Sequence, residues 1–189
     1  MAERTVATRT KRSERSTPGD FTFTREMVPT AQGANSSYIS EYRNRAWHLF
    51  ESLPLPSTKD EPWRRTDIRG LQAPSFNLAN FPDGATQLSY PPAPKELLKP
   101  LVGEEHGVQV ILLPDQSQLN LNPQLAKKGV VFTDLLTAER EHPALLQKIL
   151  GQVVRPEEGK FAALAASLAR TGVLVYVPRG VQVDEPLHS

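Results

Sequence analysis

The sequence predicts an α+β chain with a helical N-terminal region, a small mixed α/β region and short strands at its C-terminal end. Apolar residues recur at helical spacing over 38–50, and runs of β-forming residues appear only after residue 107. The 17 prolines among 189 residues indicate short elements joined by stiff connections. A chain of this length can bury one good core or the cores of two small subdomains.

Composition excludes several classes of function. The formal net charge is +1, so the chain lacks the strong field that steers nucleic acid or an anionic membrane. With 0 cysteines, these residues form no disulfide and supply no thiolate ligand to a metal centre. No apolar run approaches the roughly 20 residues that cross a bilayer, and no signal peptide is recognisable. We therefore expect a cytoplasmic or stromal-like location, without nucleic-acid or membrane partners.

Residues 1–33 are predicted to be a disordered tail, because they contain too few large apolar residues to offset their ordering entropy. A DNA-binding arm and an organelle transit peptide are the alternatives. Proteins that bind DNA phosphates typically make about six to ten such contacts, and acidic residues interrupt this segment. The charged residues among the first 20 are the cations Arg4, Arg9, Lys11, Arg12 and Arg15 and the acids Glu3, Glu14 and Asp20.

Residues 34–106 are predicted to form a helical and proline-rich region. A helix begins after Asn35, which is a good N-cap residue, and ends by Leu53, because Pro54 cannot continue it. Its apolar stripe consists of Tyr38, Tyr42, Ala46, Leu49 and Phe50, and Glu41, Arg43, Asn44 and Arg45 are expected mostly to face away. An aromatic platform for a base or sugar, including Trp47, is the alternative to packing in the core.

A second, short helix is predicted to begin at Asp60, where a proline and acidic residues favour a first turn. Trp63 would anchor it in the core. Alternatively, Arg64 and Arg65 would grip a phosphate. Residues 72–106 are expected to form ordered loop, with one helical turn at 95–98.

Residues 107–170 are predicted to form a small α/β region that alternates β-rich runs with helical periodicity. The expected strands cover 108–113, 118–121 and 129–132, and the expected helices cover 133–136, 142–150 and 160–170. The stripe of the last helix is Phe161, Leu164, Ala165 and Leu168, with Gly172 as its C-cap. Two further strands, 173–177 and 181–185, follow around Pro178 and Gly180.

No motif in the sequence indicates catalysis. In GQVVRPEEGK, residues 151–160, seven residues separate the glycines where a phosphate-binding loop needs four. The run Glu104–His106 offers metal-binding side chains that diverge, with no second cluster to complete the ligand set. The four histidines are scattered. An enzyme active site, a bound cofactor and a metal site are therefore not expected within these residues.

Two stretches resemble the N-terminal region of the SufB/SufD family, and of its SufD branch in particular. The first combines residues 43–47 with PSTKDEPWRRTDI, residues 56–68, in which an acidic residue, Glu-x-Trp-Arg and a threonine follow a proline. The second runs from Phe161 through the GVLVYVPRGVQVDEPLH segment, residues 172–188. The second stretch is the more specific one, because it is long and ungapped.

The resemblance implies that residues 171–189 begin a right-handed parallel β-helix, whose later coils would stack on these strands. The sequence would then be an N-terminal fragment. A solenoid coil cannot bury its apolar face without neighbours. We therefore expect the strands 173–177 and 181–185 to be held by preceding helices, paired between chains in strand-edge self-association, or frayed.

The resemblance also implies a non-catalytic scaffold subunit that works with SufB-like and SufC-like (ATPase) subunits to assemble and deliver iron–sulfur clusters. The cluster would be handled by the complete complex. The residues that carry the resemblance, with an expected structural role, are Trp47, Glu61, Pro62, Trp63, Arg64, Thr66, Tyr176, Pro178, Gly180, Glu185, Pro186 and His188. A stand-alone protein-interaction module and the leading part of a β-helix carbohydrate-active enzyme remain as alternatives.

Overall fold

The structure is a computed structural model that describes residues 21–31, 37–78, 91–99, 108–113, 117–121 and 123–189. The chain divides into two compact units. The smaller unit comprises the chain up to Phe23 together with Pro54–Asn77, and the larger unit comprises Thr24–Leu53 and Leu78–Ser189. Each unit is described separately below.

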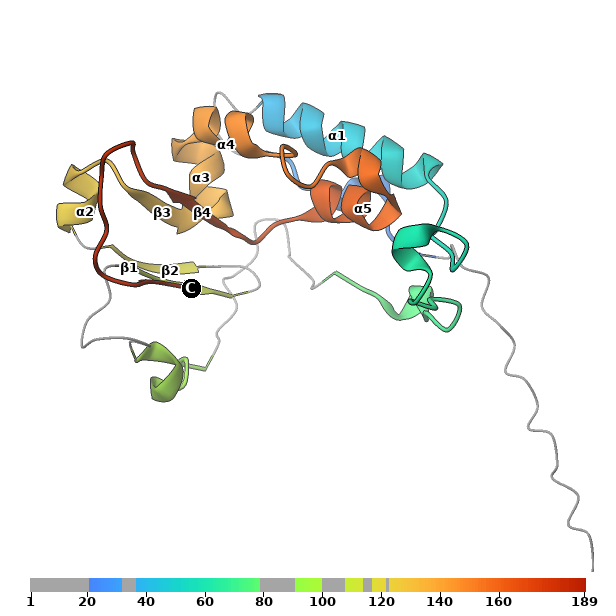
Figure 1. Ribbon diagram of the computed structural model, residues 1–189, viewed down its shortest axis with the longest axis horizontal. Helices are drawn as coiled ribbons and strands as arrows, with labels where there is room; N and C mark the ends of the chain where they lie inside the picture. Colours follow the sequence, from blue (N-terminus) through green and yellow to red (C-terminus); the bar gives the residue numbers. More distant parts are fainter. Residues whose placement is uncertain (1–20, 32–36, 79–90, 100–107, 114–116, 122) are drawn as a thin grey trace, which may run out of the picture. The chain divides into compact units, whose positions relative to one another are not determined.

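The larger unit contains helices and two small sheets (Figure 1). Its α-helices are α1 (Ser37–Ser52), α2 (Pro123–Lys127), α3 (Leu135–Glu141), α4 (Pro143–Ile149) and α5 (Lys160–Leu168). Its strands are β1 (Val108–Leu112), β2 (Ser117–Leu121), β3 (Val131–Asp134), β4 (Val173–Tyr176) and β5 (Leu187–His188). Its 3-10 helices are η1 (Arg25–Met27), η4 (Lys95–Leu98) and η5 (Pro156–Glu158).

The strands form a three-stranded sheet of order β2-β1-β5 and a two-stranded ribbon of β3 and β4. β1 and β2 are antiparallel, with Val110 opposite Leu119, whereas β5 runs parallel to β1. β3 and β4 are antiparallel, with Phe132 opposite Val175 and Thr133 opposite Leu174. Every strand of the described part of the larger unit therefore has a partner within the chain.

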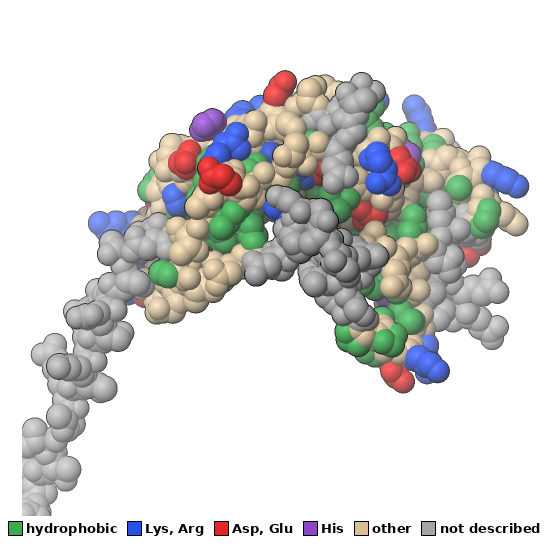
Figure 2. Space-filling model, turned by 180° about the vertical axis from the view of Figure 1, so that it is seen from behind, with side chains coloured by type: hydrophobic (Ala, Val, Ile, Leu, Met, Phe, Trp, Pro, Cys, Tyr) green, Lys and Arg blue, Asp and Glu red, His purple; other side chains and the backbone are tan. Residues whose placement is uncertain are grey.

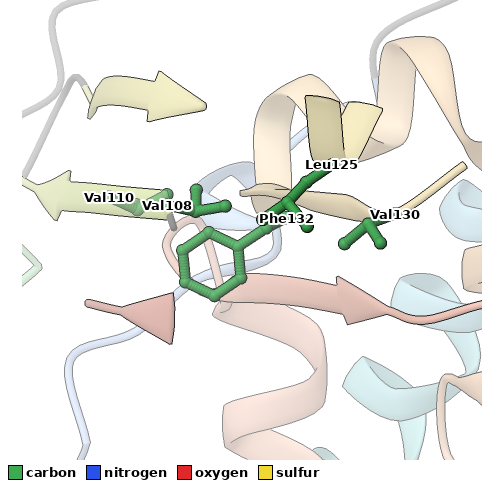
Figure 3. Packing of buried hydrophobic residues seen from close by; sticks show 5 residues of the cluster. All are labelled: Val108, Val110, Leu125, Val130 and Phe132. Atoms are coloured by element: carbon green, nitrogen blue, oxygen red, sulfur yellow. The ribbon is translucent and has the colours of Figure 1, made fainter. Parts of the chain in front are cut away.

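The β3–β4 ribbon separates two hydrophobic clusters, because successive side chains of a strand point to opposite faces. On one face Phe132 joins a cluster with the β1 sheet and α2, whose members are Val108, Val110, Leu125, Val130 and Phe132 (Figure 3). On the other face Leu174 packs with residues of α1, α3 and α4, namely Ile39, Ala138 and Leu146. The ribbon thus lies between the sheet and the helices, as Figure 1 shows.

The helices α1 and α5 lie side by side in the larger unit (Figure 1). Small residues at their contact are fully buried: Ala46 in α1, and Ala163 and Ser167 in α5. Their small side chains allow the two backbones to approach closely, and the Ser167 hydroxyl donates to the carbonyl of Leu164 within its own helix. The buried face of α5 is therefore rotated from the predicted stripe, since Ala165 is exposed and Phe161 and Leu164 are only half-buried.

The two C-terminal strands correct the prediction most clearly. β4 pairs with β3, and β5 pairs with β1, so preceding strands hold both of them, and Leu174 of β4 also packs on the preceding helices. Residues 181–185 are not a strand at all. Their alternation reflects burial instead, because Val181 and Val183 pack against the cluster around Phe132 without joining a ladder.

Other predicted elements are confirmed with shifted limits. α1, β1, β2, η4 and α4 fall where the sequence placed them, but α2 was not predicted. α5 ends at Leu168 rather than at the predicted residue 170, and its C-cap is Ala169, with φ −58° and ψ 121°, rather than Gly172. Residues 21–31 of the segment expected to be disordered include η1, and residues 1–20 lie outside the described residues.

The smaller unit contains two 3-10 turns, η2 (Glu61–Trp63) and η3 (Ala73–Ser75). The Thr22 hydroxyl donates to the carbonyl of Phe76 at 3.4 Å, and the Phe21 and Phe76 rings lie 6.3 Å apart. The predicted short helix is only one turn. The Asp60 carboxylate accepts from the backbone N–H and the hydroxyl of Ser57, at 2.7 and 3.1 Å, and does not cap a helix that follows.

Candidate functional site

A buried ion pair joins the helices of the larger unit. The Arg43 guanidinium of α1 donates from Nη1 to Glu139 Oε2 of α3 at 3.2 Å and from Nη2 to Glu139 Oε1. Nη2 also donates to the carbonyl of Ala169, just after α5, at 3.1 Å. The Arg43 and Glu139 side chains are only 4% and 1% exposed. One guanidinium thus links three helices that are far apart in sequence.

The position of Arg43 contradicts the prediction that it faces away from the apolar stripe. Arg43 lies one residue after Tyr42 and is buried with it. A charged residue is rarely buried unless it is paired, and the partner here lies 96 residues further along the chain. Sequence periodicity contains no signal for a partner at that distance.

Lys160 completes the contact between α1 and α5. Its ammonium donates to the carbonyls of Phe50 and Leu53, at 2.6 and 2.9 Å, and lies 4.6 Å from the centre of the Phe50 ring. The last carbonyls of a helix lack partners within the helix, so a cation there satisfies them and complements the helix dipole. Burial lowers the pKa of the Lys160 ammonium below its usual value.

Asp134 ends β3 and caps α3. Its Oδ1 accepts from the backbone N–H of Thr137 at 2.9 Å. Desolvation by itself would raise the pKa of this carboxyl, but hydrogen bonds from Thr137 and Ser117 outweigh it and hold the pKa below the ordinary 3.8. The ionised side chain therefore stabilises the junction between the ribbon and the helical layer.

Replacing Asp134 with alanine is expected to lower the free energy of unfolding by about 1–2 kcal/mol, because the cap is lost. Asp134→Asn keeps an acceptor and is the matched control. Because the folded-state pKa is depressed, the contribution of the charge is complete above pH 3.8 and is lost as the pH falls through the folded pKa. Urea unfolding of both variants and of the wild type from pH 7 to pH 2 measures the loss of unfolding free energy and its dependence on pH. A stability gap between wild type and Asp134→Asn that widens on acidification would contradict the assignment.

The structure places Trp47, the first of the family-motif residues, in the core. It is 2% exposed, and its ring centre lies 5.2 Å from that of Phe50. Its indole N–H has no hydrogen-bond partner among the described residues. The aromatic-platform hypothesis is therefore wrong for Trp47, because a buried ring cannot stack on a base or sugar.

The motif residues 61–66 lie in the smaller unit around η2. Glu61 and Arg64 form an exposed ion pair at 3.7 Å, and the backbone N–H of Thr66 donates to the carbonyl of Trp63 at 2.8 Å. Trp63 is half-buried rather than fully buried, and Pro62 is exposed in the first turn. Next to this turn, hydrogen bonds from Arg69 lower the pKa of Asp67 to about 2. All of these contacts join residues that are close in sequence, and they stabilise the turn.

The C-terminal motif residues follow β4 in the larger unit. Tyr176 is 41% exposed, and Gly180 has a φ of +80°, which favours glycine. Pro178 lies against Gly129, where an added Cβ would be 3.2 Å from Pro178 Cγ. Glu185 is exposed and Pro186 half-buried. His188 lies in β5, with its Nδ1 3.4 Å from Gln109 Nε2 of β1.

In the part of the chain that the structure describes, these motif residues lie in turns, in strands and at one core contact. Within the described ranges no three histidine, aspartate or glutamate side chains are grouped to hold a metal ion. The Glu104–His106 hypothesis lies outside the described residues. No described helix is long and apolar enough to span a membrane. Acidic and basic side chains are interspersed on the face shown in Figure 2.

Comparison with known proteins identifies the family. The family model described as SufBD protein N-terminal region matches residues 22–188. The iron–sulfur cluster assembly protein SufD of Bacillus subtilis (strain 168) is 30% identical over 157 residues, which cover 81% of this chain and 34% of that protein. No solved structure matches the chain.

Two further relatives are proteins of the same family. The iron–sulfur cluster assembly SufBD family protein SH2035 of Staphylococcus haemolyticus (strain JCSC1435) is 27% identical over 80% of this chain and 33% of its own length. The SufBD family protein ABCI9 of Arabidopsis thaliana is 25% identical over 81% of this chain and 35% of its own length. The chain spans about a third of the length of these curated relatives. The chain belongs to the SufBD family and corresponds to the N-terminal region of its members.

Proposed function

We propose that this chain is the N-terminal region of a SufD-like, non-catalytic scaffold subunit. The subunit would act with SufB-like and SufC-like (ATPase) subunits to assemble and deliver iron–sulfur clusters, in the cytoplasm or in a plastid stroma. The observation that carries the proposal is the family match over residues 22–188. The relatives that share this match are named as iron–sulfur cluster assembly proteins.

In this proposal the iron–sulfur cluster is the cargo of the complex. The 189 residues contain 0 cysteines, so thiolate ligands for the cluster would come from other parts of the complex. The role of these residues would be to maintain the structure of the N-terminal region. The Arg43–Glu139 pair, the Lys160 cap and the Asp134 cap hold α1, α3 and α5 in one arrangement.

We also propose that the region after β4 leads into a right-handed parallel β-helix in the complete subunit. Val175, Tyr176 and Val177 are 48%, 41% and 39% exposed, so a later coil could bury them. The relatives are about three times as long as the matched region, which leaves room for such a core. Neither a stand-alone interaction module nor a carbohydrate-active β-helix enzyme is favoured by the comparisons.

Native co-purification tests the proposal. The complete gene product, tagged and expressed in its own organism, is expected to elute with a SufB-type and a SufC-type subunit in a fixed ratio. The same tag on an unrelated soluble protein is the control. Elution of the tagged protein without either subunit, under conditions in which both are present in the cell, would contradict the proposed scaffold role.

A further inference from the structure

A loop that presents apolar side chains to solvent follows α4 and takes no part in the contacts described above. Ile149 ends α4 with 49% of its surface exposed, and Val153 and Val154 are 88% and 61% exposed. Single exposed apolar residues are normal, but here three lie within six residues of the chain. The segment 149–155 is named the valine loop.

The valine loop is held at both ends. Gly151 has a φ of +68° and lies against the Tyr42 ring, where an added Cβ would be 2.9 Å from Cε2. After the loop, Pro156 is fully buried, and the Glu158 carboxylate accepts from the backbone N–H of Arg155 at 3.0 Å. The valines are thus presented on a braced turn, so that docking them would cost little ordering entropy.

Two basic side chains close to the valines lack an acidic partner among the residues that the structure describes. Lys148 and Arg155 are exposed on either side of the valines, and neither has an ion-pair partner among the described residues. The acids that follow the loop make other contacts, because Glu157 lies 3.8 Å from Arg45 and the Glu158 carboxylate accepts from the backbone N–H of Arg155. Two cations without acidic partners therefore border the apolar tip. A complementary surface would carry acidic groups at its rim.

We propose that the valine loop is a protein-docking site that inserts into an apolar pocket of a partner protein with aspartate or glutamate at the pocket rim. With 88% of its surface exposed, Val153 projects into solvent, and a concave surface would bury more of it than a flat one. The central apolar contact would supply the affinity, and the charged rim would supply orientation and specificity.

Other occupants fit this surface less well. Segments that dock on membranes usually bring tryptophan, phenylalanine or leucine on an amphipathic helix. The valine loop is not a helix, and its one residue of these types, Leu150, is half-buried against the cluster around Ile39. A second copy of this chain would offer the exposed run Val175–Val177. That run is followed by the exposed cation Arg179, which would repel the cations of the valine loop. The proposal adds a binding surface to the proposed scaffold role and does not depend on that role.

Site-specific photo-crosslinking in the cell tests the proposal. The photoreactive amino acid p-benzoylphenylalanine replaces Val153 in the complete gene product, and the same replacement at Glu41, an exposed residue of α1, is the control. We expect position 153 to crosslink to one protein with a yield about tenfold above the control, as for a residue at the centre of an interface. Mass spectrometry should map the crosslink to an apolar peptide that contains aspartate or glutamate.

Charge reversal provides the second readout. The double substitution Lys148→Glu and Arg155→Glu is expected to lower the crosslinking yield about tenfold, because it places acids against an acidic rim. Thermal melting followed by circular dichroism verifies that the variant folds, as both side chains are exposed. Crosslinks to a second copy of the chain or to lipid, a yield equal to the control, or a yield unchanged by charge reversal would each overturn the proposal.

Discussion

Replacing Glu139 with alanine is expected to lower the free energy of unfolding by about 3–5 kcal/mol, which is the typical cost of removing one partner of a buried ion pair. The cost is large because Arg43 would stay buried with a single remaining acceptor, the carbonyl of Ala169. Chemical denaturation followed by circular dichroism measures the change. The same experiment on Arg43→Ala should give a loss of similar size.

Two further variants separate the buried pair from ordinary surface electrostatics. Arg45→Ala removes an exposed pair with Glu157 from the same helix and should cost less than about 1 kcal/mol. The double variant Arg43→Met with Glu139→Leu removes both charges and should recover most of the loss, since apolar replacements of a buried pair are often neutral. If Glu139→Ala were no more destabilising than Arg45→Ala, the buried pair would not hold the helices together.

Truncating Trp47 to alanine is expected to lower the free energy of unfolding by about 3–5 kcal/mol, through lost burial and the cavity left behind. Trp47 is 2% exposed and contacts Phe50 at the interface of α1 with α5. Denaturant titration followed by far-ultraviolet circular dichroism measures the loss. Trp63→Ala, at the half-buried tryptophan of the smaller unit, should cost clearly less.

Trp47→Phe is the informative companion variant. Because the indole N–H of Trp47 has no hydrogen-bond partner among the described residues, phenylalanine removes volume but no hydrogen bond. Its cost should therefore lie well below that of Trp47→Ala, at about 1–2 kcal/mol. Equal losses for the two variants would mean that the indole nitrogen makes an essential contact.

Local patterns predicted most of the elements of this fold. The stripe around Tyr42 identified α1, the β-forming run at 108–112 identified β1, and the single turn of η4 was placed correctly inside a proline-rich stretch. Each of these signals lies within a few residues of the element that it predicts. Residues 123–127 form only five residues of helix, which is too short for a periodic pattern to appear.

Pairings between distant residues were not predictable in the same way. The run 181–185 was wrongly predicted to be a strand, whereas Val181 and Val183 are half-buried outside any ladder. Burial requires only an apolar neighbour, whereas a ladder requires a free strand edge in register, and here β5 takes the place beside β1. The same limit applies to Arg43, whose helix position alone could not reveal Glu139.

The candidate site was predicted only in part. The resemblance singled out the motif residues, and the structure shows the surroundings of two of them: Trp47 lies in the core and Gly180 has a left-handed backbone conformation. The valine loop was read only as a failed phosphate-binding pattern, because sequence alone does not show that Val153 projects into solvent. Exposure of an apolar residue is a property of the packed molecule.

The most direct test of the proposed role is the activity of an iron–sulfur enzyme, such as aconitase, in cells that lack the gene for the complete subunit. The proposal predicts a loss of aconitase activity at unchanged aconitase protein level, restored by the wild-type gene. A gene that encodes the destabilised Glu139→Ala variant should restore less aconitase activity than the wild-type gene. Full aconitase activity in the deletion strain, in the absence of any second cluster-assembly system, would contradict a role in iron–sulfur cluster assembly.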